Sequence, residues 1–196
     1  MACTDKSLYA DMPWCPGSPV LPGIRGKVLC ISKKDIIQWP TLKDKKTATS
    51  MADLVTYTGN FTLASDKKWL IIDIVDNKSS VTSEAQGEQP CITNLNKGTF
   101  MYPGTNEDAT GFAAQANSDD LVYIFFSKEG KARVLGNEMW QTTTKVSQNT
   151  GSGPTDEAGT TIEVEVTDLC PAPFYPGELE TSAGTYDGAT GTLAGE

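Results

Sequence analysis

The sequence predicts a mainly β protein: a β-sandwich or partly closed barrel with one flanking α-helix and an extended arm at each end. Three observations predict this class: apolar runs of strand length recur, only one stretch has helical periodicity, and Pro and Gly gather near both ends. A chain of 196 residues favours one domain. Such a domain can bury roughly 70% of the surface that its unfolded chain exposes, so it needs no covalent staple. We expect a Pro-rich arm over residues 1–25, a β-sandwich domain over 26–170 and a C-terminal arm or flexible tail over 171–196.

The first segment is marked by regularly spaced prolines. They follow one another at three-residue intervals, at Pro13, Pro16, Pro19 and Pro22. Proline has a fixed φ and lacks a backbone donor, so this segment cannot enter a central strand or the interior of a helix. Its apolar side chains, such as Trp14, allow two interpretations. It is either an extended arm that lies on a neighbouring molecule or a loop packed on its own domain.

Strand patterns begin directly after the Pro-rich segment. We expect strands at residues 27–32, 61–64 and 69–75, and a polar strand at 78–88. In residues 69–75 both alternating faces are largely apolar, so we expect this strand to be covered on both sides. The polar stretch 43–58 is predicted to form a long loop or an irregular hairpin.

One helix is predicted over residues 106–117. Apolar residues recur there at helical spacing and form one narrow stripe. The members of the stripe are Ala109, Phe112, Ala113 and Ala116. Thr105 fits the N-cap position, with Asp108 three residues later as in a capping box. A stripe made mostly of alanine favours close packing of this helix against a sheet.

The strongest strand pattern is the apolar run 121–127. Residues 128–131 give a tight-turn signal, and residues 132–135 return as the hairpin partner. Residues 141–147 are Thr-rich and are expected to be extended. From residue 178 to 196 the chain is rich in Gly, Ala and Thr, which predicts a flexible tail.

The last strand pattern alternates between two faces. In residues 160–168 the even-numbered positions from Ile162 to Val166 are apolar, whereas Glu163 and Glu165 lie on the opposite face. This pattern is typical of a half-buried strand. Its outer face is predicted to be acidic and in contact with solvent.

Composition excludes several classes of function. With 25 acidic against 16 basic residues the formal net charge is −9, which argues against nucleic-acid binding and against docking on an anionic membrane. A negative surface repels DNA, which is useful where DNA must pass without sticking. The chain has no histidine, so Ser-His-Asp and Cys-His nucleophiles and the common His-bearing zinc sites are excluded. Chemistry that needs only carboxylates, such as glycoside hydrolysis, is still open.

The cysteine pattern predicts free thiols in a reducing compartment. The five residues Cys3, Cys15, Cys30, Cys91 and Cys170 are odd in number and widely spaced, without a Cys-x-x-Cys motif. The first eleven residues carry charges where a signal peptide has its apolar core, so we expect no signal peptide. No apolar run has the length that spans a bilayer, and we expect a protein made in the cytoplasm without membrane insertion.

Acidic pairs are the remaining candidates for chemistry. Asp119 and Asp120 precede a strand, and Asp73 and Asp76 flank the end of another. Neighbouring residues rarely converge on one ligand, and no calcium-loop spacing is present. A buried functional acid with a raised pKa is the alternative for Asp73. We expect a solvated or paired structural role for all four, and hence no catalytic residue, metal site or cofactor, and no enzyme.

The tryptophans leave one binding function open. Trp14, Trp39, Trp69 and Trp140 can line a platform for a sugar, so a carbohydrate-binding β-sandwich module is an alternative. Trp69 lies inside a strand pattern and is expected in the core. Trp39 and Trp140 follow strands, where they can lie at rims or subunit contacts, and aromatic residues are enriched at such contacts.

One series of motifs has a recognisable order. It consists of GTNEDATGFA at 104–113, DLVYIF at 120–125, GKARVLG at 130–136, GTT at 159–161 and PFY at 173–175. This order, over residues 98–177, resembles tail tube (major tail) proteins and related structural proteins of phages and prophages of gut Bacteroidetes-type bacteria. The resemblance rests on the order of motifs and covers the second half of the chain.

The resemblance implies a virion structural protein that assembles with copies of itself and with other tail or virion proteins. In that family, a β-sandwich with a flanking helix forms homo-hexameric rings whose inner strands join into a barrel. The rings stack into a tail tube that conducts DNA without specific binding. Such a protein is assembled in the bacterial host cytoplasm and ends in the virion tail. Head–tail connectors, tail terminators and capsid decoration proteins are alternatives within the virion.

Residue roles follow as expectations from this resemblance. Glu163 and Glu165 are candidates for lumen-facing acids, although an outer solvent face fits the pattern equally well. A ring of six carries roughly fifty excess negative charges, a strong barrier to DNA adhesion. The candidate subunit-contact residues are Trp14, Trp39, Trp140 and Tyr175.

Overall fold

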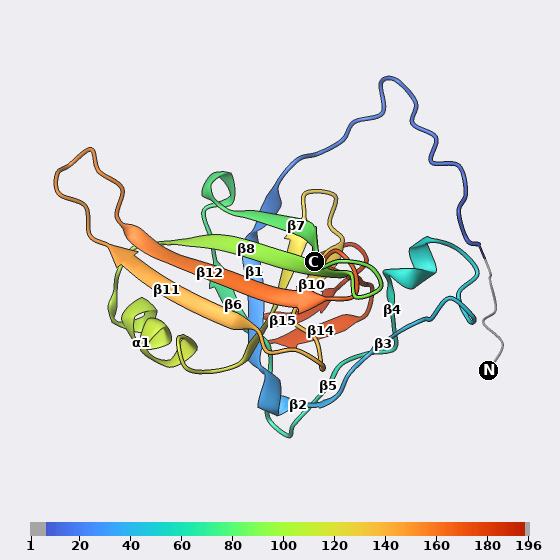
Figure 1. Ribbon diagram of the computed structural model, residues 1–196. Helices are drawn as coiled ribbons and strands as arrows, with labels where there is room; N and C mark the ends of the chain where they lie inside the picture. The colour runs from blue at the N-terminus through green and yellow to red at the C-terminus, as the bar shows by residue number, and fades with distance from the viewer. Residues whose placement is uncertain (1–6, 195–196) are drawn as a thin grey trace.

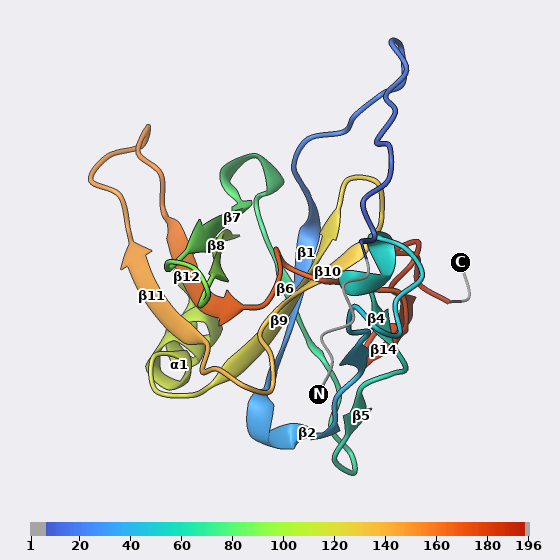
Figure 2. The same cartoon turned by 45° about the vertical axis from the view of Figure 1, so that its right-hand side comes forward.

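A computed structural model describes residues 7–194 (Figure 1). It confirms the predicted class: the chain is mainly β, with several antiparallel sheets and one α-helix, arranged as a sandwich. Within the described residues no sheet closes into a barrel. Figure 2 shows three layers, with a central sheet between a second large sheet and a group of short two-stranded sheets.

The central layer is a five-stranded antiparallel sheet in the order β13-β10-β9-β1-β6. Its strands are β1 (Ile24–Ser32), β6 (Leu70–Asp73), β9 (Leu121–Ser127), β10 (Ala132–Leu135) and β13 (Phe174–Tyr175). The β9–β10 hairpin is confirmed as predicted. Every residue of β9 from Leu121 to Phe126 is buried, because this strand has an apolar core on each face.

The second layer is a four-stranded antiparallel sheet in the order β11-β12-β8-β7. Its strands are β7 (Ser80–Gln86), β8 (Thr93–Pro103), β11 (Thr143–Asn149) and β12 (Gly159–Asp168). Side chains of this sheet, including Phe100, Ile162 and Val164, pack against Tyr123 and Phe125 of the central sheet. Burial of each such apolar side chain stabilises the fold by about 1.5–3 kcal/mol.

Strand β8 has no counterpart among the predicted strands. Its sequence is polar and contains Gly98, features that β-propensity penalises. A Cβ at Gly98 would lie 2.7 Å from Leu135 Cδ1 and 2.9 Å from Phe100 Cζ, so any other residue here would displace these two buried side chains. Asn96 is fully buried, but its amide donates to Cys170 O and accepts from Ala172 N, both at 3.1 Å. Tertiary contacts therefore stabilise a strand that local preferences disfavour.

Three two-stranded antiparallel sheets of the described chain cover the other face of the central sheet. They are β2 (Ile36–Gln38) with β5 (Thr62–Leu63), β3 (Thr41–Leu42) with β4 (Tyr57–Thr58), and β14 (Glu178–Thr181) with β15 (Gly184–Asp187). A second core forms beneath them around Ile124, Trp69 and Leu179. The chain therefore covers both faces of its central sheet by itself, without a neighbouring molecule.

The prediction of a flexible C-terminal tail is wrong for residues 178–194. Leu179 and Tyr186 are buried in the second core, and Trp69 N donates to Glu180 O at 2.9 Å. These contacts hold the β14–β15 hairpin against the central sheet, so the folded domain extends well beyond residue 170. Residues 195–196 of the predicted tail lie outside the described part.

The helix α1 (Glu107–Ala116) lies within its predicted bounds but begins at a different cap. Asn106, not Thr105, is the N-cap, and its Oδ1 accepts from Ala109 N at 3.0 Å. Ala109 and Ala116 are buried, as the apolar stripe predicts. Among residues 7–194 the other helical turns are of the 3₁₀ type: η1 (Lys33–Asp35), η2 (Ala52–Leu54) and η3 (Asp76–Lys78).

The N-terminal arm leaves the folded body. Residues 7–23 contain no helix or strand, and in both ribbon views they run outward from β1 and turn back at a distance from the sheets (Figures 1 and 2). Tyr9, Met12 and Trp14 are 93%, 84% and 65% exposed. The first six residues of the predicted arm lie outside the described part of the chain.

Candidate assembly surfaces

The outward face of the four-stranded sheet presents the two acids singled out in the sequence. Glu163 and Glu165 are exposed, whereas Ile162, Val164 and Val166 are buried, so the predicted alternation of β12 is confirmed. The strands beside β12 add mainly hydroxyl side chains to this face. These are Thr82, Thr99, Thr143 and Ser147, and β12 itself adds Thr161.

Lysines from both neighbouring strands moderate the acidity of this face. Glu163 is paired in register with Lys145, and Glu165 with Lys97. Lys97 Nζ lies 3.8 Å from Glu165 Oε1, with both side chains about half exposed. Exposed pairs of this kind contribute about 0–1 kcal/mol. The face is therefore polar and mixed in charge rather than uniformly acidic.

The two edges of this sheet differ. Strand β7 is exposed along most of its length and pairs only with β8 among the described residues. Met101 N donates to Ser79 Oγ, which places the odd-numbered backbone groups of β8 toward β7. Antiparallel pairing then directs the N–H and C=O groups of Val81, Ser83 and Ala85 outward. This edge is an open template for another strand.

The opposite edge, β11, is partly guarded by the helix end. Val146 N donates to Asn117 Oδ1 at 2.8 Å, and Gln148 Nε2 donates to Thr110 Oγ1 at 3.2 Å. A strand that pairs with β11 must displace the Asn117 side chain from the outward N–H of Val146. The sheet thus has one open edge and one edge that is partly capped.

The predicted aromatic contact residues lie in three different settings. Trp14 is on the exposed arm, Trp39 packs edge-on against Phe61 with ring centroids 5.4 Å apart, and Trp140 is half-buried with its carbonyl accepting from Lys33 Nζ. Tyr175 is only 1% exposed, so the single chain already buries this predicted contact residue in its own core.

Tyr175 has a structural role of its own. Phe61 N donates to its hydroxyl at 3.2 Å, and the hydroxyl donates to Glu178 O at 3.1 Å. The side chain thereby joins the strand β13, the loop before β5 and the C-terminal hairpin. Trp69 is 2% exposed, as predicted for a core residue, and is not available to a sugar platform.

The acidic pairs hold turns in place. Asp120 Oδ1 accepts from Thr142 N at 2.9 Å and its Oδ2 lies 3.5 Å from Lys33 Nζ, while Asp119 accepts from Ser32 Oγ at 3.0 Å. Asp73 forms an exposed ion pair with Lys27 at 3.2 Å. These contacts join the ends of β1, β9 and β11. Each of these three acids therefore has a partner within the chain, which accounts for its presence without a catalytic or metal-binding role.

Asp76 pairs with Lys128. The hydrogen bond from the Lys128 ammonium, followed by its charge, lowers the pKa of the Asp76 carboxyl. This contact ties η3 to the turn between β9 and β10.

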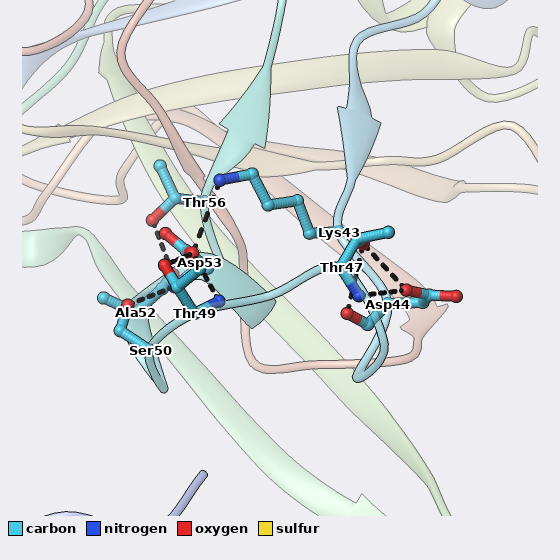
Figure 3. A network of polar contacts seen from close by, with 8 residues as sticks. All are labelled: Lys43, Asp44, Thr47, Thr49, Ser50, Ala52, Asp53 and Thr56. Carbon is cyan, nitrogen blue, oxygen red and sulfur yellow. Dashed lines mark hydrogen bonds and ion pairs between the residues drawn. The ribbon is translucent and has the colours of Figure 1, made fainter. Parts of the chain in front are cut away.

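A polar network stabilises the loop between β3 and β4 (Figure 3). Asp44 Oδ1 accepts from the backbone and hydroxyl of Thr47, and Asp53 Oδ2 does the same for Thr49. The Thr49 hydrogen bonds, and then Lys43 at 3.3 Å, lower the pKa of Asp53 well below its ordinary value. Each carboxylate accepts hydrogen bonds from a residue three or four positions away, within its own turn. These local bonds explain how a polar segment is held in place. The segment forms an irregular hairpin, which is one of the two forms predicted for it.

Sequence reasoning missed one buried acid, Asp168. It is 3% exposed, and its Oδ1 accepts from Leu169 N at 2.7 Å. Its Oδ2 has no hydrogen-bond partner within the described residues. Burial raises the pKa of this carboxyl. The alternation of β12 carried the signal, because position 168 continues the buried face that includes Ile162 and Val166.

Residues 7–194 contain neither a group of metal-binding side chains nor a long apolar helix. No three His, Cys, Asp or Glu side chains of this part are grouped so that they can hold a metal ion. Its helices are too short or too polar to cross a bilayer.

Comparison with known proteins gives no relative. No family model matches the chain, and no curated protein or solved structure matches it significantly.

Proposed function

We propose that this chain is a virion structural protein, a tail tube subunit that assembles into stacked homo-oligomeric rings through which DNA passes. The motif order in residues 98–177 motivates this proposal. One observation of the fold carries it: the four-stranded sheet ends on one side in β7, a seven-residue strand whose outward backbone groups are unpaired within the described chain. In the proposed ring, β7 of each subunit pairs with β11 of the next.

Pairing of two different edges is a head-to-tail contact. Such contacts close into rings when the rotation between subunits closes, and otherwise extend into filaments. The open β7 edge supplies outward groups at three alternate residues, and β11 supplies a strand of equal length. Each junction must displace Asn117 from Val146 N, so the helix end sets a small barrier to assembly.

A closed ring of these sheets turns its polar face toward the lumen. Glu163, Glu165 and the adjacent hydroxyl side chains then line the channel, with Lys97 and Lys145 between them. Because acids and lysines alternate on this face, the negative electrostatic field at the lumen surface is weakened. Repulsion of DNA then depends more on the net charge of −9 per subunit, which multiplies around the ring.

Electron microscopy of the purified full chain over a range of concentrations tests the proposal. Rings or tubes are expected, and a monomer at every concentration contradicts it. Ser83→Pro removes an outward donor of β7 without touching the β7–β8 ladder, and is expected to reduce assembly at least tenfold. Ser83→Ala is the matched control that keeps the donor and should assemble like the wild type. Equal assembly by both variants would exclude the β7 edge.

A further inference from the structure

A second open edge lies on the flank of the sandwich, beside β6. Two adjoining hollows of about 390 and 290 Å³ run between this strand and α1. They share Cys30, Leu70 and Phe112 as lining residues, and Ile72 lines the larger one. Leu70 is 59% exposed, although the sequence predicted a strand covered on both sides. We name this feature the β6 groove and define it by these four residues.

The backbone of β6 is unpaired where it faces the groove. Ile74 N donates to Gly26 O at 2.9 Å. Since the pairs of an antiparallel ladder alternate, the N–H and C=O groups of Ile71 and Asp73 then point away from β1. Within residues 7–194 no strand pairs with them there.

Both ends of this gap are already occupied. Trp69 N donates to Glu180 O at 2.9 Å, and Val75 N donates to Met101 O at 2.7 Å. The open edge is therefore short and closed at both ends. It has room for a short extended segment but not for the edge of another sheet. The groove beside it accepts the apolar side chains of such a segment on one face.

The arm contains one segment of this kind. Among residues 7–23, only 7–12 form a run of more than two residues without proline, and strand pairing needs the N–H that proline lacks. In an extended segment, Leu8, Ala10 and Met12 share one face. That face is apolar, and Met12 is 84% exposed in the single chain.

The arm does not occupy the groove of its own chain. Figures 1 and 2 both place its first described residues on the side of β3 and β4, away from α1. The eleven residues 13–23 reach at most about 35–40 Å when extended, enough to bring residues 7–12 to an adjacent molecule. Asp11 is the only charged residue of the described arm. In the smaller hollow Lys34 pairs with Asp119 and Lys67 with Asp35. Lys68, which also lines this hollow, has no ion pair among the described residues and can therefore pair with Asp11 of an arriving segment.

We propose that the β6 groove binds residues 7–12 of a second copy of this chain as an added strand, with Leu8, Ala10 and Met12 facing the groove. The inference rests on the proposed self-assembly, for which it names a contact separate from the β7 edge.

Photo-cross-linking of the full chain tests the contact. A photoreactive amino acid replaces Met12, and unlabelled protein is mixed with isotopically heavy protein before irradiation. Adducts between a light and a heavy chain on β6 or α1 are expected. Adducts within one chain overturn the second copy as the occupant, and adducts elsewhere overturn the groove.

Two matched pairs of variants examine the backbone pairing. Asp73→Pro removes an outward donor that the chain's own ladder does not use, while Asp73→Ala loses the same ion pair and keeps the donor. Ala10→Pro and Ala10→Ser make the same comparison on the arm, where folding of the core is not at risk. Each proline variant is expected to lower the yield of light–heavy adducts at least tenfold relative to its control, and unchanged yields overturn the inference.

The outcomes separate the two proposals. Rings or tubes with adducts outside the groove leave the proposed function standing and overturn the arm contact. Groove adducts in small oligomers without rings or tubes support the arm contact and contradict the tail tube. A monomer without light–heavy adducts contradicts both.

Discussion

Replacing Asp168 by asparagine is expected to stabilise the folded chain at neutral pH. The carboxylate is buried and has one hydrogen-bonded oxygen and one without a partner in the described chain. Burial also raises the pKa of Cys170 to about 12, so this neighbour is neutral at pH 7. Burial is the larger effect and the pKa of Asp168 is raised, although the hydrogen bond from Leu169 N and the nearby Asn137 amide favour the carboxylate.

The magnitude follows from the contacts that change. Asparagine keeps the Oδ1 acceptor for Leu169 N and removes the buried charge. An unsatisfied buried polar group costs about 1–3 kcal/mol, and part of this cost persists because the new amide also lacks a partner. We expect a gain of about 1 kcal/mol in unfolding free energy, which for a chain of this size raises the melting temperature by about 2–4 °C.

The pH dependence gives the sharper test. A raised pKa means that the folded state holds the proton more tightly than the unfolded state, so the penalty is absent below the ordinary pKa of 3.8. It grows as the pH rises through the folded-state pKa. The gain in unfolding free energy from Asp168→Asn should therefore increase from nearly zero in acid to its full value at pH 7.

Urea unfolding at a series of pH values measures this difference. Glu163→Gln removes the same charge from an exposed site and is the matched control, with an expected effect within about 0.5 kcal/mol. A gain that is equal at all pH values, or a loss of stability at pH 7, would refute the reasoning, because it would mean that the Asp168 carboxylate is satisfied in the fold.

Two further predictions concern the parts of the fold that the sequence did not place correctly. Leu179→Ala is expected to lower the unfolding free energy by about 2–5 kcal/mol because Leu179 is fully buried in the second core. The exposed Val20→Ala should change it by less than about 0.5 kcal/mol, and equal effects in denaturant titrations would mean that the hairpin does not pack. Asn106→Ala should cost about 1 kcal/mol through loss of the cap to Ala109 N, whereas Thr105→Ala should cost much less; the reverse order in thermal unfolding would restore Thr105 as the cap.

The sequence was sufficient where one local pattern decided the structure. Strand β9 is a continuous apolar run and β12 alternates strictly, so their identity and the outward direction of Glu163 could be read directly. Strand β8 could not, because Asn96 is buried by hydrogen bonds to residues more than 70 positions away. The C-terminal hairpin is similar, since Leu179 and Tyr186 are separated by small and polar residues that give no strong pattern.

Prediction of the candidate surfaces required the tertiary fold, which local sequence patterns do not contain. The acids of β12 were found by alternation, but their pairing with Lys97 and Lys145 depends on the register between strands. Tyr175 was expected at a subunit contact from the resemblance of the motif order. Its burial is a consequence of the hairpin that folds back over it.

A core that one chain completes restricts how its copies can associate. Both faces of the central sheet are covered from within, so an interface has to use strand edges, the polar face of the second sheet or the arm. Edge pairing suits a chain of net charge −9, since backbone hydrogen bonds act at contact, while repulsion between exposed charges is screened over about 8 Å at physiological ionic strength. The β7 edge and the β6 groove are open in different ways, one long and polar, the other short and apolar. In the proposed tube, two contacts of different chemistry would let one subunit join its neighbours within a ring and between rings without competition for the same surface.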